Sequence, residues 1–126
     1  MEVSHPIVAF QDDRGRIIDL LESIDFSHAT VIFSRKNATR GNHYHKETTQ
    51  WIYVLRGKML AHARIPGGPL RRAVLEAGDL IKNPPFEQHA FVALKDCELL
   101  VLSAGVRGGK HYEKDTYRLD KPMQDE

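Results

Sequence analysis

Two of the seven histidines, His43 and His45, are separated by a single residue. In an extended strand this spacing places both imidazoles on the same face, close enough to share one metal ion or one substrate. Imidazole is a common metal ligand, and because its unperturbed pKa is about 6.5 it also exchanges protons near neutral pH. The pair alone is a weak signal in a short, histidine-rich chain, so its meaning depends on the elements around it.

Short apolar runs separated by turn signals make up most of the chain. The run Lys58–Ile65 alternates between two faces, and the clearest turn follows at Pro66-Gly67-Gly68-Pro69. We expect strands over Ile7–Phe10, Arg16–Leu21, Thr30–Ser34, Trp51–Leu55, Lys58–Ile65, Arg71–Leu75, Asp79–Ile81, His89–Ala93 and Glu98–Ser103. Runs this short favour an all-β sandwich or barrel. A helix at Leu20–Phe26 is an open alternative, and His111–Arg118 could hold one helical turn.

Length and composition narrow the class of protein. With 126 residues, 41% hydrophobic and 28% charged, the chain predicts one domain over residues 1–126, with a core at about 7–104 and a C-terminal tail at 105–126. Eighteen basic against 17 acidic residues argue against a general nucleic-acid binder. No apolar run is long enough to span a membrane, and the first residues do not resemble a secretory signal, so we expect a cytoplasmic protein. Cys97, the only cysteine, is expected in the core.

The surroundings of the histidine pair follow two spaced motifs, formed by His43, His45, Gln50 and Gly57 and then by Gly78, Pro84 and His89. In spacing they resemble the two motifs of the cupin superfamily, with Gln50 where the first motif has Glu. The resemblance implies an all-β, single-domain jelly-roll, that is, a small antiparallel barrel. It also implies that His43, His45 and His89 point into the mouth of that barrel.

A narrower resemblance begins with the run Arg40-Gly41-Asn42-His43-Tyr44-His45. It is similar to the sugar-nucleotide cupins of cell-surface polysaccharide synthesis, namely the dTDP-sugar 3,4-ketoisomerases and the cupin domain of capsular polysaccharide reductase/epimerases. Asp13-Arg14-Gly15, Gln50 and Asp115-Thr116-Tyr117-Arg118 are also similar to these branches, so the likeness is nearly full-length. It implies a nucleotide-sugar ligand and a homodimer.

The first functional hypothesis is therefore an isomerase or epimerase of a nucleotide-linked keto-deoxysugar. Moving a carbonyl to the neighbouring sugar carbon needs a proton removed from carbon and returned next to it, and we assign this work to His43 and His45, in either order. Arg40 is expected to hold the pyrophosphate or the developing enediolate charge, since a guanidinium offers five donors. Further candidates for the substrate cavity are Tyr53, together with Trp51 or Phe86 as an apolar wall, and His62 and Arg64 from one strand face.

Two other classes of function remain open. A metal-dependent cupin enzyme, for instance an oxygenase, would use His43, His45, His89 and Gln50 around zinc, iron, nickel or manganese. Gln50 would alternatively orient a neighbouring imidazole by a hydrogen bond. A module that binds a sugar or nucleotide without turnover is the third class. The first hypothesis requires no cofactor, and none of the three predicts a nucleic-acid or membrane partner.

Overall fold

The computed structural model describes residues 1–105 and 114–126. In these ranges the chain forms β-strands and one short 3-10 helix, with the bounds β1 (Glu2–Ser4), β2 (Val8–Asp12), β3 (Gly15–Ile18), β4 (His28–Ser34), β5 (Thr39–Tyr44), β6 (Thr49–Arg56), β7 (Lys58–Arg64), β8 (Arg71–Glu76), β9 (Leu80–Asn83), β10 (Gln88–Ala93), β11 (Cys97–Ala104), β12 (Tyr117–Arg118) and η1 (Met123–Asp125). The all-β class predicted from the short alternating runs is confirmed. Within the same ranges, no helix has the length and apolar character needed to cross a membrane.

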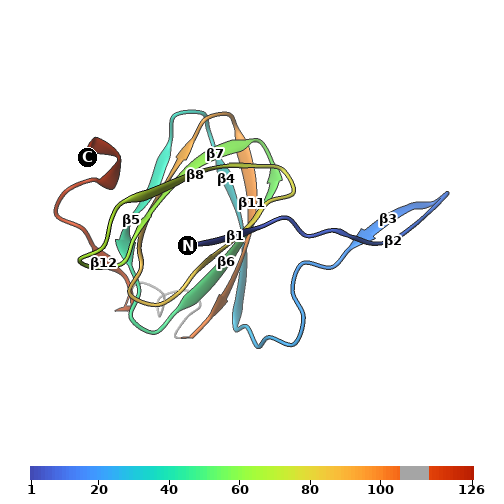
Figure 1. The fold of residues 1–126 in the computed structure, drawn as a ribbon, viewed down its shortest axis with the longest axis horizontal. Helices are drawn as coiled ribbons and strands as arrows, with labels where there is room; N and C mark the ends of the chain where they lie inside the picture. Colours follow the sequence, from blue (N-terminus) through green and yellow to red (C-terminus); the bar gives the residue numbers. More distant parts are fainter. Residues whose placement is uncertain (106–113) are drawn as a thin grey trace.

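Two five-stranded antiparallel sheets face each other around one core (Figure 1). The first sheet has the order β1-β9-β6-β11-β4, and the second has the order β12-β5-β10-β7-β8. Strands β2 and β3 pair only with each other in the described chain, and their hairpin projects away from the two sheets (Figure 1). Most neighbours in each sheet are distant in sequence, so the fold brings remote segments together.

Strict alternation along the strands explains the core. In β6, Ile52 and Val54 are buried, whereas the alternating residues Trp51 and Tyr53 lie on the outer face. Strand β11 alternates in the same way and buries Cys97 as predicted, so the cysteine serves as a small core side chain. On the facing sheet the buried residues include Met59, Ala61, Ala63, Leu75, Phe91 and Ala93.

The structure corrects the expected boundaries of the core. Residues 8–18 form the projecting hairpin and expose most of their side chains, whereas the segment expected as a tail contributes β12 and the buried side chains of Asp115 and Met123. The alternative helix at Leu20–Phe26 is absent, because this stretch is irregular. The helical turn expected at His111–Arg118 lies partly outside the described residues, and its last two residues form β12.

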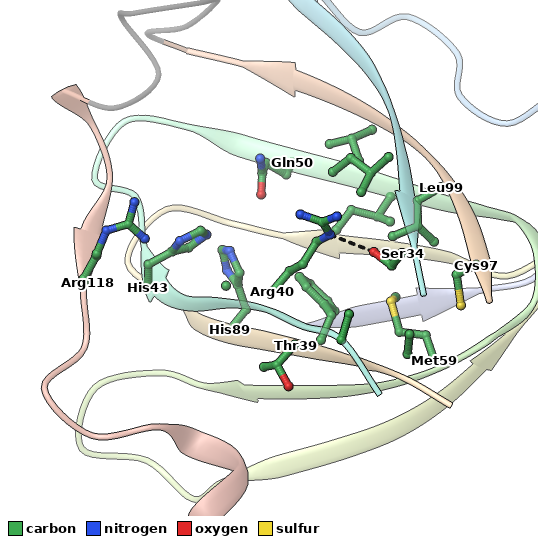
Figure 2. A pocket seen from close by; sticks show the side chains of 17 residues that line it. Ser34, Thr39, Arg40, His43, Gln50, Met59, His89, Cys97, Leu99 and Arg118 are labelled. Atoms are coloured by element: carbon green, nitrogen blue, oxygen red, sulfur yellow. Dashed lines mark hydrogen bonds between the residues drawn. The ribbon is translucent and has the colours of Figure 1, made fainter. Parts of the chain in front are cut away.

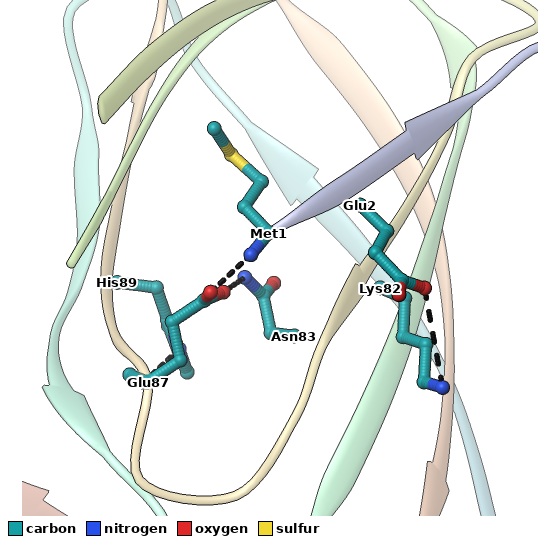
Figure 3. Close-up of polar contacts among 6 residues, drawn as sticks. All are labelled: Met1, Glu2, Lys82, Asn83, Glu87 and His89. Atoms are coloured by element: carbon teal, nitrogen blue, oxygen red, sulfur yellow. Dashed lines mark hydrogen bonds and ion pairs between the residues drawn. The ribbon is translucent and has the colours of Figure 1, made fainter. Parts of the chain in front are cut away.

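A buried polar network supports the turn between β9 and β10. The Glu87 carboxylate contacts the Met1 amino group and accepts a 2.7 Å hydrogen bond from Asn83 Nδ2 (Figure 3). The backbone carbonyl of the same Glu87 accepts a hydrogen bond from His89 Nδ1 at 3.2 Å. The network therefore fixes the backbone on which one of the site histidines is held.

Candidate functional site

The three histidines that the sequence singled out converge. His43 lies on β5 opposite His89 of β10 in the antiparallel ladder, and His45 follows one residue beyond the end of β5. The ring of His43 lies 4.8 Å from the ring of His45 and 4.8 Å from that of His89, between centroids. Their candidate ligand nitrogens all lie within 4.8 Å of one another. The prediction that positions 43, 45 and 89 meet in one place is thus confirmed.

Backbone carbonyls fix two of these rings. The carbonyl of Asp115 accepts a hydrogen bond from His45 Nδ1 at 2.9 Å, and that of Glu87 accepts one from His89 Nδ1. Because a carbonyl can only accept, both imidazoles carry their proton on Nδ1 and direct the Nε2 lone pair elsewhere. Nε2 of His89 and Nδ1 of His43 are buried without a hydrogen-bond partner in the described structure. Such unsatisfied buried nitrogens can bind a ligand.

Two histidines of the cluster, His43 and His89, are uncharged at neutral pH. Burial, with smaller contributions from His45 and Arg118, lowers the pKa of His43 from 6.5 to about 4. Burial also places the pKa of His89 well below its usual value, and His43 and His45 add to the effect. Desolvation and like charge both disfavour the imidazolium form. Neutral imidazoles can accept a proton or bind a metal ion, so the electrostatics allow both chemistries.

The cluster borders a cavity of about 440 Å³ between the two sheets. His43, His89 and Gln50 line it together with two arginines, Arg40 and Arg118, as Figure 2 shows. The rest of the wall is largely apolar, with Ile32, Ile52, Met59, Phe91, Leu99 and Val101. His45 is not part of this lining and is 2% exposed beside the other two histidines. The cavity therefore joins a polar, cationic part to an apolar interior.

Arg40 spans the opening between the sheets. Its Nε donates a 2.7 Å hydrogen bond to Ser34 Oγ on β4 (Figure 2). An NH2 group donates one of 2.9 Å to the carbonyl of Phe33. These two contacts hold the guanidinium at the edge of the first sheet while it remains partly exposed. The expected location of Arg40 at the cavity is confirmed.

Two further site residues come from the segment that the sequence analysis placed in a tail. Arg118 stands opposite His43 in the β12–β5 ladder and lines the cavity, and Asp115 binds His45 through its carbonyl. The signal that could have found them was the Asp115-Thr116-Tyr117-Arg118 run itself. Its contacts with β5 depend on long-range packing, and no local pattern encodes them.

Three candidate substrate residues lie outside the cavity lining, which corrects the expectation for them. Tyr53 lies on the outer face of β6, because the neighbouring positions 52 and 54 point inward. His62 and Arg64 lie on the outer face of β7, because Met59, Ala61 and Ala63 take its inner face. Arg64 binds the Glu126 carboxylate at 2.7 Å and so anchors the C-terminal segment. Trp51 and Phe86, the alternatives for an apolar wall, are also outside the lining.

Replacing Gly41 with alanine is expected to destabilise the protein and separate β5 from β10. Gly41 has φ +93°, and an added Cβ would lie 2.7 Å from the carbonyl oxygen of His89. Positive φ costs a non-glycine residue about 1–2 kcal/mol, and the steric clash should add about 1–3 kcal/mol. Urea unfolding measures the loss. Gly67→Ala is the matched control, since Gly67 has φ +83° with nothing within 4 Å of the added Cβ; equal losses for both variants would contradict the clash.

Comparison with solved structures agrees with the barrel. A dTDP-4-dehydrorhamnose 3,5-epimerase from Sulfolobus tokodaii is 23% identical, with a TM-score of 0.75 over 98% of this chain and 81% of that one. A sugar 3,4-ketoisomerase from Thermoanaerobacterium thermosaccharolyticum, in complex with TDP, is 22% identical, with a TM-score of 0.75 over 94% and 88%. A 3'-monoepimerase from Streptomyces bikiniensis, in complex with dTDP-quinovose, is 17% identical, with a TM-score of 0.80 over 98% and 71%.

Comparison with protein sequences gave two results. No curated protein sequence matches the chain. The sequence profile of the cupin family, in contrast, matches residues 18–115, which include both histidine motifs and the strands from β4 to β11. The spacing of the motifs, the antiparallel barrel and this match agree, and the chain belongs to the cupin family.

Proposed function

We propose that this cupin is an isomerase or epimerase of a nucleotide-linked keto-deoxysugar, of the kind used in polysaccharide or glycan biosynthesis. The observation that carries the proposal is the histidine cluster, with an uncharged His43, at a cavity that two arginines also line. The similar structures named above support it, because they are enzymes of nucleotide-linked sugars and two of them hold TDP or a dTDP-sugar.

In this proposal His43 exchanges the proton with the substrate. It lines the cavity, its ring is only partly buried, and it is neutral at pH 7, so it can accept a proton from the carbon beside the sugar carbonyl. The electron pair of the broken C–H bond moves onto the carbonyl oxygen and gives an enediolate. For isomerisation, the imidazolium then returns the proton to the former carbonyl carbon, while the hydroxyl proton of the first carbon passes to the former carbonyl oxygen and leaves the new carbonyl. For epimerisation, a second acid protonates the first carbon from the opposite face, the electron pair returns from oxygen to restore the carbonyl, and the imidazolium releases its proton to solvent. Anionic charge in the cavity favours the imidazolium and so raises the basicity of His43 during the reaction.

Two arginines supply positive charge that complements the negative charge of the substrate. Arg40 and Arg118 line the cavity, and guanidinium groups bind diphosphate or enediolate oxygens through several donors at once. On the cavity side of β4 the lining residues are Ile32 and Ser34, and no tyrosine is among the lining residues of the described chain. The proposed proton transfer therefore rests on the histidines.

Incubation of the protein with dTDP-4-keto-6-deoxyglucose in deuterated water tests this function. Deuterium at the carbon beside the carbonyl, together with a new ketosugar in the NMR spectrum, is the expected result. If a range of nucleotide-linked ketosugars gives no deuterium incorporation and no new product, the proposed function is refuted. A rise in Tm with these ligands and no product would instead favour a binding module without turnover.

A metal-dependent cupin enzyme is the second candidate, favoured by the unpartnered nitrogens of His43 and His89. The donor set fits a divalent ion: three imidazoles lie together, and backbone carbonyls orient two of them through Nδ1. His43, His45 and His89 would hold the ion, with Gln50 as a weaker neutral ligand. A bound ion would supply Lewis-acid polarisation of a substrate oxygen. Calorimetric titration of chelator-treated protein with zinc, iron(II), nickel or manganese salts tests this, and absence of binding would exclude it.

We further propose that the protein is a homodimer. On the outer face of the first sheet, Val31, Leu100 and Tyr53 are direct cross-strand neighbours, and Val31 and Phe33 are 50% and 64% exposed. The β2–β3 hairpin and its flanks also expose apolar side chains, with Ile7 82% exposed. Extended apolar surface of this kind is typical of subunit interfaces, which bury about 800 Å² per partner.

Light scattering is expected to give twice the mass of one chain, and Val31→Asp is expected to shift the protein to the monomer. The substitution places a charge in the apolar patch at a position that is exposed in the single chain, so it should not unfold it. Far-UV circular dichroism checks that fold. A wild-type protein that is monomeric at micromolar concentration, or an unchanged dimer in the variant, would contradict the proposed interface.

A further inference from the structure

His45 lies just beyond the paired strand, where its carbonyl accepts a 2.6 Å hydrogen bond from the backbone N–H of Phe86; this bond holds the main chain but does not orient the ring. Strand β5 ends at Tyr44, and His45 begins the connection to β6. Its ring nevertheless lies within 4.8 Å of the ring of His43 and 5.4 Å of that of His89, so its place in the cluster is well defined. The cause must come from contacts with other parts of the chain.

Asp115 provides those contacts. Its carbonyl accepts the hydrogen bond from His45 Nδ1 at 2.9 Å. Its carboxylate accepts from the backbone N–H of Lys46 at 3.0 Å, from that of Glu47 at 3.1 Å and from Thr48 Oγ1 at 2.6 Å. One side chain, 3% exposed, thus holds the three residues that follow His45 while its main chain holds the imidazole.

The Asp115 carboxylate accepts these three hydrogen bonds in its ionised form. Burial alone would raise its pKa, but hydrogen bonds from Thr48, Lys46 and Glu47 reverse this and leave the pKa below the usual value. An ionised carboxylate accepts several hydrogen bonds at once, and each is stronger than a bond between neutral groups. Thr48 is 1% exposed, so solvent does not reach its hydrogen bond with the Asp115 carboxylate.

We propose that Asp115 is a positioning residue that fixes both the place and the tautomer of His45. With the proton held on Nδ1, Nε2 of His45 carries the lone pair and points away from the Asp115 carbonyl. Asp115 is not part of the cavity lining and acts only through His45 and the 46–48 loop. Its effect on turnover rests on the proposed isomerase function, whereas its effect on the tautomer does not.

Histidine side-chain 15N NMR and steady-state kinetics together test the proposal, with the variants Asp115→Ala and Thr48→Val. Asp120→Ala is the matched control, an exposed aspartate of the same C-terminal segment. In wild type and control, His45 should be the Nδ1–H tautomer. Asp115→Ala keeps the carbonyl of residue 115 but removes the three hydrogen bonds that hold the 46–48 loop against it, so the carbonyl should no longer stay aligned with His45 Nδ1. A mixture of tautomers is therefore expected, with kcat lower by about 10–100-fold and KM changed by less than about threefold. Thr48→Val, which removes one hydrogen bond, should lower kcat by about fivefold.

The outcomes separate this proposal from the proposed function. A folded Asp115→Ala protein that keeps the Nδ1–H tautomer of His45 would overturn the positioning role, whether or not the wild type turns over a ketosugar. If wild type shows no turnover but the variant changes the tautomer, the proposed function fails and the positioning role stands. If Asp115→Ala does not fold, Thr48→Val decides by the same two measurements, and an unchanged tautomer and rate would overturn the role.

Discussion

The His43→Asn variant is expected to lose about 10²–10⁴-fold in the rate of ketosugar isomerisation, the usual contribution of a general acid–base group. His43 is the histidine of the cluster that both lines the cavity and remains partly exposed, whereas His45 and His89 are almost completely buried. Asparagine keeps a polar side chain of similar reach but cannot take up a proton at neutral pH. Exchange of substrate hydrogen with deuterated water should fall by the same factor, since both processes begin with the removal of that proton.

His5→Asn serves as the control for this experiment. His5 is exposed, lies outside the cavity lining and contacts Asp79, so its replacement should leave the rate unchanged. Binding of dTDP to His43→Asn, measured by calorimetry, shows whether the cavity is intact. A rate within about threefold of wild type in a variant that binds normally would remove His43 from the proton transfer, because even the low end of the expected loss is about 100-fold.

The free energy of unfolding is expected to fall as the pH is lowered from 6.5 towards 4. The unfolded chain protonates His43 near pH 6.5, but in the folded protein burial and the neighbouring His45 and Arg118 lower this pKa to about 4. Within that window the unfolded state binds the extra proton, so stability is fully present above pH 6.5 and is lost on acidification. The difference at His43 alone corresponds to about 3 kcal/mol, and His89 acts in the same direction.

Urea unfolding of chelator-treated protein at pH 7.5, 6.0 and 5.0 measures this loss. His43→Asn should show a shallower dependence on pH, because it removes one of the groups that titrate differently in the two states. Equal unfolding free energies of the wild type at pH 7.5 and 5.0 would contradict the prediction. The same holds if the variant keeps the full dependence, since the loss would then come from other groups.

The class of fold and the centre of the site could be predicted from the amino-acid sequence. Apolar and polar residues alternate in Lys58–Ile65 and in Glu98–Ser103. This pattern predicts strands because neighbouring side chains of a strand point to opposite faces. The spacing of His43, His45 and His89 relative to their glycines and proline also sufficed to predict that these histidines meet, because it matches a family whose barrel is known. Local periodicity and spaced motifs are properties of the sequence alone, so the strands and the meeting of the histidines could be predicted from them.

Which face of each strand lies inside depends on long-range packing and does not follow from the local pattern. Period-two alternation groups His62 with Arg64 and separates Tyr53 from Ile52, but it does not state which group faces the cavity. The small side chains of Ala61 and Ala63 fill the interior of β7, so His62 is on the other face. For the same reason Tyr53 belongs to the apolar outer surface that we assign to a subunit interface.

Tertiary structure also decided what surrounds the histidines. Asp115 and Arg118 are about 70 residues from His45 and His43, and they reach the site because β12 pairs with β5 at the edge of the second sheet. Such pairing depends on the packing of the whole chain and leaves little trace in the residues next to it. The lowered pKa values have the same origin, since burial exists only after both sheets have closed around the cluster.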